Sequence, residues 1–246
     1  MTPPVDPSNN RVQVLRFRLV WGGPLVWVAH LDRMRALERA ILRAGLPVAF
    51  SQGYNPRPQL VFALPSGVGV SSRAEYVDVS LGREVDAEQA AQALNSSLPK
   101  GIEVLGVTEI PVELATHVMS QVRISDYVLQ RSGISSRFLP LLEREDLTVM
   151  KFSKGKERPL NIRPLILEVR AESEDRLLLR RLAGSRENLR PDLLLLALRQ
   201  FAGDTEADET SIERRDLWIL PEKGARALVR PIALAGETEE IVWDGE

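Results

Sequence analysis

The order of hydrophobic patterns along the chain constrains its fold most. Residues 12–20 alternate apolar and polar side chains, which predicts a half-buried strand, and residues 31–44 space apolar side chains three and four apart, which predicts a helix. Two short apolar stretches follow at 47–50 and 60–64, on either side of a turn, and further patterns predict a strand at 75–81, a helix at 87–94 and a strand at 102–107. This β-α-β-β-α-β order is typical of a ferredoxin-like module.

The second half of the chain repeats the mixture of strands and helices. Helices are expected at residues 138–144 and 192–201, the latter opened by Pro191, and strands at 122–129, 148–152, 165–170, 177–182 and 212–219. The halves share no residue identity that we recognise, so the inference of a duplicated architecture rests on element order. We therefore expect an α+β fold of two tandem ferredoxin-like modules with antiparallel sheets.

The expected domain limits follow from these elements. A first module should cover residues 11–115 and a second residues 120–220, with the hinge near 111–120. Residues 1–10 are rich in Pro, Asn and Ser and are expected to be a disordered lead-in, and residues 221–246 are expected to be an acidic C-terminal tail.

The composition excludes several kinds of chemistry. The chain has no cysteine, so it can form no disulfide, thiolate nucleophile or cysteine-held iron–sulfur cluster. Its histidines are His30 and His117, so a multi-histidine metal site is not expected either. No apolar run approaches the about 20 residues that cross a bilayer, and residues 1–10 do not look like a signal peptide. We expect a cytoplasmic protein without a membrane partner or a bound metal.

Charge is distributed unevenly although the net charge is only −2. Residues 11–65 contain eight arginines and two acidic residues, whereas acidic residues gather after Asp204. This asymmetry favours an anionic partner for the first half, for which RNA is one candidate. The alternative interpretation is an ordinary solvated face.

The predicted helix at 31–44 carries the first candidate site residues. Its expected core stripe is Leu31, Met34, Leu37, Ile41 and Leu42. Arg35 and Arg39 lie four residues apart on another face, where they are candidates for binding phosphates. His30 and Asp32 at the start of the helix, with Glu75 in a later strand, are candidate catalytic residues. Structural roles, a buried hydrogen-bonded histidine and a helix-stabilising aspartate, are the alternatives.

A rigid turn follows at residues 53–58, Gly-Tyr-Asn-Pro-Arg-Pro. Its two prolines restrict φ, so Tyr54 is expected to stack on a base while Arg57 contacts a phosphate or base edge. The expected substrate-binding residues are therefore Arg35, Arg39, Ser51, Tyr54, Asn55, Arg57 and, in the second half, Arg163. The alternative is a structural crossover. Residues 67–72, Gly-Val-Gly-Val-Ser-Ser, lack Walker or dinucleotide spacing and do not predict nucleotide binding.

Several short motifs resemble those of the radical SAM-linked proteins, a bacterial family of unassigned biochemical function. They are His30-Leu31-Asp32, residues 53–58, Leu64-Pro65, Gly67-Val68-Gly69, Ala74-Glu75-Tyr76, Ile162-Arg163-Pro164 and Arg190-Pro191. The resemblance covers nearly the whole chain. Ala29 stands where relatives usually have serine, and Asn161 where they usually have aspartate, which argues against a catalytic acid at that position.

The resemblance implies a companion of a radical SAM enzyme, because such proteins are fused to or encoded beside one. S-adenosylmethionine (SAM) and an iron–sulfur cluster are then expected only in the partner enzyme, since this chain has no cysteine. The expected function is to bind or present the substrate, with RNA, as in tRNA or rRNA modification, inferred from the arginines and the aromatic turn. The alternative is a stand-alone RNA-modifying enzyme of pseudouridine-synthase-like architecture that uses His30, Asp32 or Glu75.

Overall fold

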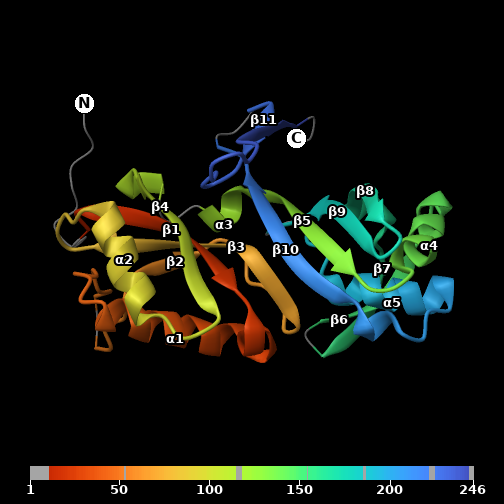
Figure 1. Cartoon of the computed structure of the whole chain (residues 1–246), viewed down its shortest axis with the longest axis horizontal. Coiled ribbons are helices and arrows are strands. Elements are labelled where there is room, and N and C mark those ends of the chain that lie inside the picture. Colours follow the sequence, from red (N-terminus) through yellow and green to blue (C-terminus); the bar gives the residue numbers. More distant parts are fainter. Residues whose placement is uncertain are drawn as a thin grey trace.

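The computed structural model describes residues 11–52, 54–114, 118–153, 155–184, 187–221 and 225–243. It is an α+β fold built on one large, mostly antiparallel sheet, as Figure 1 shows. The expected lead-in at 1–10 lies outside the described residues. No helix in the described residues has both the length and the apolar character needed to cross a membrane.

The first half contains the elements that the hydrophobic patterns predict. They are β1 (Gln13–Trp21), the 3₁₀ helix η1 (Gly23–Trp27), α1 (His30–Arg43), β2 (Leu60–Phe62), β3 (Val70–Leu81), α2 (Ala87–Ser97) and β4 (Ile102–Ile110). Asp86 caps α2 by accepting a hydrogen bond from the Gln89 amide at 2.8 Å. Of the two apolar stretches, 60–64 contains β2, whereas in 47–50 Val48 and Phe50 form only isolated bridges.

The buried face of α1 differs from the expected stripe. Leu37 and Ile41 are buried as expected, but Leu31 and Leu42 are exposed. Arg33 takes a place in the buried stripe. The helix therefore sends a guanidinium, as well as aliphatic side chains, into the interior.

The second half adds seven larger elements and several short ones. They are η2 (Val112–Leu114), α3 (Val118–Gln121), β5 (Val122–Gln130), α4 (Ile134–Phe138), η3 (Leu139–Glu143), β6 (Thr148–Ser153), β7 (Lys156–Asn161), η4 (Arg163–Leu165), β8 (Ile166–Ser173), β9 (Arg176–Leu182), α5 (Pro191–Ala202), η5 (Ala207–Glu209) and β10 (Ser211–Ile219). The helix expected at 138–144 is largely the 3₁₀ segment η3, since Pro140 in its first turn has no amide hydrogen to donate. Strand β7 was not predicted because its exposed sequence lacks alternation.

Most strands of both halves belong to one sheet, in the order β4-β1-β3-β10-β5-β9-β8, with β2 beside β3, whereas β6 and β7 form a separate two-stranded sheet. The expected separation into two tandem modules is therefore not confirmed. Strand β2 pairs only with residues 77–79 of β3, which leaves the beginning of β3 available to β10. There β10 pairs in parallel, residues 212–214 beside 70–72, whereas the other strand pairs are antiparallel.

A buried ion pair crosses this junction. Arg214 of β10 is fully buried and pairs with Glu75 of β3. Its guanidinium also donates to the Leu64 carbonyl at 2.8 Å and to the Ser72 hydroxyl at 3.3 Å. One side chain from the second half thus contacts three residues in two segments of the first, β3 and the chain at Leu64.

The described C-terminal residues pack on the sheet. Strand β11 (Ala227–Val229) pairs with the end of β10 and with β12 (Glu240–Val242). Glu237 forms an ion pair with Arg18 of β1, and Arg230 lies 3.0 Å from Asp216 of β10. Burial raises the pKa of Asp216 to about 6, although Arg230 acts in the opposite direction. This part of the expected tail therefore contributes to the fold.

The ion pair at the junction makes a testable stability prediction. Glu75→Ala should lower the free energy of unfolding by about 3–5 kcal/mol, because Arg214 would stay buried without its carboxylate. The double variant Glu75→Leu/Arg214→Met should lose much less, since no charge then remains in the interior. Urea denaturation followed by circular dichroism measures both.

The matched control is Asp32→Ala, which breaks the exposed pair between Asp32 and Arg35. Exposed pairs contribute at most about 1 kcal/mol. Equal effects of Glu75→Ala and Asp32→Ala would contradict a structural role for the buried pair.

Candidate binding cleft between the two halves

A cleft of about 1010 Å³ lies over the junction of the two halves. Its floor comes from β3, β5 and β10, one wall from η1 and residues 64–69, and the other from the start of α5 and residues 208–211. Helix α1 packs on the core of the first half and α5 on the core of the second. The short parallel pair between them therefore remains open enough to form a cavity.

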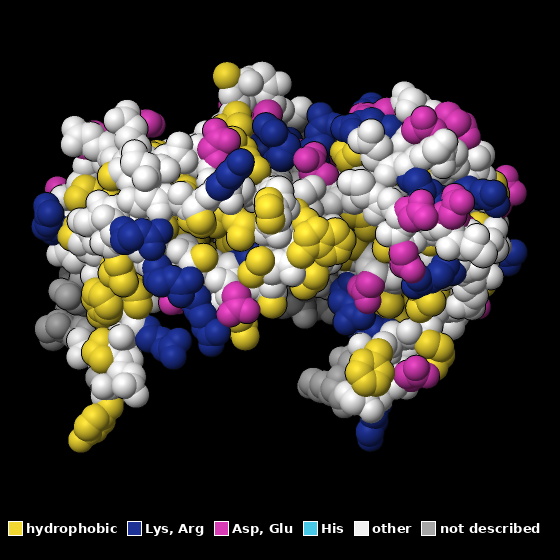
Figure 2. Space-filling model, turned by 60° about the horizontal axis from the view of Figure 1, so that its bottom comes forward, with side chains coloured by type: hydrophobic (Ala, Val, Ile, Leu, Met, Phe, Trp, Pro, Cys, Tyr) yellow, Lys and Arg dark blue, Asp and Glu magenta, His cyan; other side chains and the backbone are white. Residues whose placement is uncertain are grey.

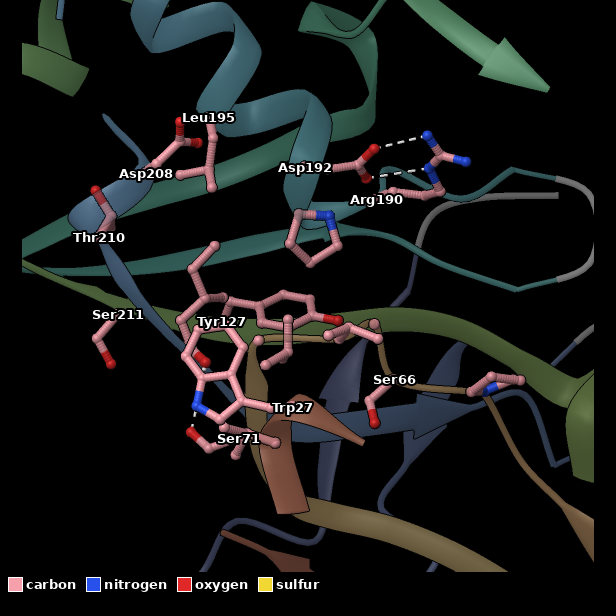
Figure 3. A pocket seen from close by; sticks show the side chains of 18 of the residues that line it. Trp27, Ser66, Ser71, Tyr127, Arg190, Asp192, Leu195, Asp208, Thr210 and Ser211 are labelled. Carbon is pink, nitrogen blue, oxygen red and sulfur yellow. Dashed lines mark hydrogen bonds and ion pairs between the residues drawn. The ribbon is translucent and has the colours of Figure 1, made fainter. Parts of the chain in front are cut away.

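Trp27 is the most exposed large aromatic side chain of the cleft, with 72% of its surface accessible. It stands over Gly69, whose φ is +81° and whose amide donates to the Val26 carbonyl at 2.7 Å. A Cβ at Gly69 would lie 3.3 Å from the indole ring, so only glycine lets the indole pack here without strain. In Figure 3 the indole projects into the middle of the pocket.

The wall below Trp27 is held from behind by Arg33 of α1. Its guanidinium donates to the Ser66 hydroxyl at 2.9 Å and to the carbonyls of Ser66 and Gly67 at 2.8 and 3.2 Å. It also lies 5.2 Å from the ring centre of Trp21. Arg33 thus fixes residues 66–67 in place, because its planar guanidinium donates hydrogen bonds to several acceptors at once.

A second buried arginine, Arg181 of β9, lines the other side of the cleft. It donates to the Tyr127 hydroxyl at 2.8 Å, to the Asn188 side-chain oxygen at 2.6 Å and to the Leu182 carbonyl at 3.2 Å. Its Nε has no partner among the described residues. Burial lowers the pKa of Arg181, and Tyr127 counteracts part of that effect.

Polar side chains border the cleft where α5 begins. Arg190 and Asp192 form two hydrogen bonds of 3.1 and 2.6 Å, shown as dashed lines in Figure 3. Thr210 is buried, and its hydroxyl has no partner within the described part of the chain. The cleft therefore combines an aromatic surface, apolar walls and donors that are not fully used.

Comparison with known proteins gives a family. A model of uncharacterized proteins conserved in bacteria, DUF2344, matches residues 15–191, a span that contains Trp27, Arg33 and Arg181. The chain belongs to the DUF2344 family. No curated protein matches it. Among solved structures, a dye-decolorizing protein from V. cholerae is 11% identical, and the match covers 82% of this chain and 90% of that chain. Its TM-score of 0.20 is too low to indicate a shared fold.

Two of the three candidate catalytic residues of this DUF2344 protein lie close to Arg33 and Arg214. His30 is half-buried, and its ring meets Phe62 edge-on with the ring centres 5.8 Å apart. Burial lowers the pKa of His30, with Arg33 and Arg214 acting in the same direction and Glu75 against them. The imidazole is therefore neutral at physiological pH, and Glu75 is already paired with Arg214.

The candidates on the outer face of α1 are all exposed. Asp32 and Arg35 form an ion pair of 3.0 Å, with 59% and 62% of their side-chain surfaces accessible. Arg39, one turn further along, is exposed as well. The structure therefore separates Asp32 from buried Glu75 and presents Arg35 and Arg39 to solvent.

The candidates in the turn after α1 form a closed, exposed loop. Ser51 donates its amide to the Arg57 carbonyl at 2.8 Å, and its hydroxyl accepts from the Arg57 amide at 3.0 Å. Tyr54 is fully exposed, and Asn55 and Arg57 are exposed too. Tyr54 is thus not packed on α1. Gly53 lies outside the described residues.

Arg163, the candidate of the second half, serves the local backbone. Its guanidinium donates to the carbonyls of Leu142 and Ile166 at 3.2 and 3.4 Å. The neighbouring Asn161 accepts from the amides of Leu147 and Arg163, both at 3.0 Å. These bonds hold the chain around η4.

None of the site residues expected from the sequence is among those that line the cleft in the described chain. Trp27, Arg181, Asn188 and Thr210 were not singled out. The sequence did offer signals for the cleft: Trp27 is a large aromatic after a Gly-Pro turn, and the motifs Leu64-Pro65, Gly67-Val68-Gly69 and Arg190-Pro191 all line it. No group of three or more histidines, aspartates or glutamates that could hold a metal occurs within the described ranges.

The seat of Trp27 can be tested with a pair of glycine variants. Gly69→Ala should shift the fluorescence of Trp27 and lower stability by about 1 kcal/mol or more, because the new methyl group meets the indole in a strained backbone conformation. The control is Gly203→Ala, where φ is +61° and nothing lies within 4 Å of the added carbon. It should lose stability without changing Trp27 emission. Identical emission spectra for both variants would show that Gly69 does not position Trp27.

Proposed function

We propose that this protein is an accessory protein of a radical SAM enzyme that binds and presents the substrate, and that the substrate is RNA. The observation that supports a binding role is the cleft. In it the exposed Trp27 packs on Gly69, next to a wall that Arg33 holds in place through Ser66. The radical SAM partner is inferred from the resemblance of the sequence motifs. SAM and the iron–sulfur cluster would then belong to the partner.

Binding is favoured over catalysis because the candidate acids are engaged elsewhere. Glu75 is buried in its pair with Arg214, and Asp32 pairs with Arg35 on the surface. A stand-alone enzyme would need a carboxylate within hydrogen-bond reach of His30 and of a substrate. The alternative that uses His30, Asp32 or Glu75 therefore has less support.

RNA is favoured by the basic and aromatic surface of the first half. Arg35 and Arg39 are exposed on α1, and Tyr54 and Arg57 project from the following loop. Figure 2 shows Lys and Arg side chains over both halves of the face, with Asp and Glu among them, and hydrophobic side chains near its middle. Arginine forks suit phosphates, and an exposed aromatic ring suits an unpaired base.

We also propose that the fold consists of two tandem ferredoxin-like modules fused edge to edge. The strand order β4-β1-β3-β2 of the first half and β10-β5-β9-β8 of the second correspond to each other. The β6–β7 hairpin would then be an insertion into the second module. Two modules of this kind are compatible with the proposed RNA-binding role.

The RNA proposal is tested by titrating single-stranded RNA at several salt concentrations. Arg35→Ala/Arg39→Ala should weaken binding and reduce the salt slope by about one unit for each lost phosphate contact. Tyr54→Ala should reduce the free energy of RNA binding by about 1–3 kcal/mol with little change in the salt slope, because it removes stacking on a base. The control is Arg137→Ala/Arg170→Ala, two exposed arginines of the second half.

Two outcomes would contradict the proposal separately. If the parent protein fails to bind RNA at low salt, RNA is not the substrate. Purification of the tagged chain from its native cells should recover a radical SAM protein, and consistent failure to do so would argue against that partner.

A further inference from the structure

We infer that the cleft is a binding site for a planar ring that carries an anionic group, which is the chemistry of a nucleotide. The ring would stack on Trp27, and the anion would lie near Arg181. This inference rests on the proposed function only in treating the cleft as the place where substrate binds. It goes further in naming the chemical class and the two side chains that recognise it.

The anion is inferred from the charge that the protein leaves uncompensated. Five arginines of the described residues are buried, and three of them, Arg16, Arg18 and Arg214, pair with carboxylates. Arg33 and Arg181 have no carboxylate within ion-pair distance among the described residues; their partners are hydroxyls, carbonyls and an amide oxygen. A buried charge is unfavourable unless it is paired, so a bound anion would supply the missing negative charge.

Unused donors in the same cleft support this assignment. The Nε of Arg181 and the hydroxyl of Thr210 are buried and have no hydrogen-bond partner in the described chain. Both residues line the cleft. Buried polar groups without a partner are uncommon in native proteins and often mark a ligand site. Bonds from such donors would orient an anion.

The acidic side chains at the rim do not oppose an anion strongly. Asp192 is neutralised by Arg190, and Asp208 forms an ion pair with Arg199. Glu209 is exposed to solvent, where its field is screened. Arg181 is therefore a charge on the inner surface that no carboxylate pairs with in the described residues, and Arg33 lies behind the wall at Ser66.

The ring is inferred from Trp27 and its surroundings. One edge of the indole rests on Gly69, yet 72% of the side chain stays accessible in a cleft whose other walls include Pro65, Leu195 and Ile212. Such a site accepts a flat ring between an aromatic face and aliphatic side chains. Stacking on tryptophan tolerates any base, so the site is not expected to select one base strongly.

A nucleotide can reach the cleft as part of an RNA chain or as a free nucleoside monophosphate. Both carry the same ring and phosphate. The test therefore uses AMP, UMP, adenosine and an eight-nucleotide single-stranded RNA, titrated by calorimetry into the full chain. The variants are Trp27→Ala, Trp27→Phe and Arg181→Met, each checked by circular dichroism.

The inference predicts that AMP and UMP bind more tightly than adenosine. Trp27→Ala should lower the affinity for AMP by about tenfold, and Trp27→Phe should lower it less, because phenylalanine retains a stacking surface. Arg181→Met should bring AMP down to the affinity of adenosine, since only the phosphate uses that charge. Should Arg181→Met fail to fold, the affinities of the parent and of Trp27→Ala for AMP and for adenosine still test whether the cleft recognises a ring and an anion. The control is Phe152→Ala, which removes an exposed aromatic side chain of β6 outside the cleft and should leave mononucleotide binding unchanged.

The outcomes separate this inference from the proposed function. RNA binding that depends on Arg35 and Arg39 but not on Trp27 would overturn the inference and leave RNA as the substrate. Binding of mononucleotides without binding of RNA would support the inference and contradict the proposal that the substrate is RNA. Equal affinity for AMP and adenosine in the parent, or no binding of any probe, would overturn it.

Discussion

The buried pair between Arg214 and Glu75 is the interaction on which the arrangement of the two halves depends. It lies where β10 meets β3, and the same guanidinium binds the Leu64 carbonyl at the start of the cleft wall. A buried pair of this kind adds little net stability but strongly disfavours any arrangement that separates its members. It therefore favours one register between the halves, and that register places the walls of the cleft opposite each other.

Buried arginines recur as the means by which this protein positions backbone. Arg33 holds residues 66–67 from behind, and Arg163 holds the chain near η4. Arg33 and Arg181 both keep an unpaired Nε and have no carboxylate within ion-pair distance in the described structure, but only Arg181 lines the open cavity. A buried guanidinium without a carboxylate, placed beside a cleft, is the physical basis for expecting an anionic ligand there.

Local patterns predicted the elements but not their assembly. The 3.6-residue spacing located α1, and Pro191 indicated the start of α5. The pairing of β3 with β10 joins segments about 140 residues apart, and no local pattern encodes such a choice of partner strand. The cleft was missed for the same reason, since Arg181 looks like an ordinary outward polar residue of a strand until Tyr127 and Asn188 are placed around it.

The central claim is that the cleft over the junction holds the ring and the anion of one nucleotide of the substrate. A crystal structure of the full chain soaked with AMP tests this most directly. The account predicts density for the base against the Trp27 indole and for the phosphate within hydrogen-bond distance of Arg181 or Thr210. Density at Arg35 and Arg39 with an empty cleft, or a base bound with its phosphate pointing away from Arg181 into solvent, would contradict it.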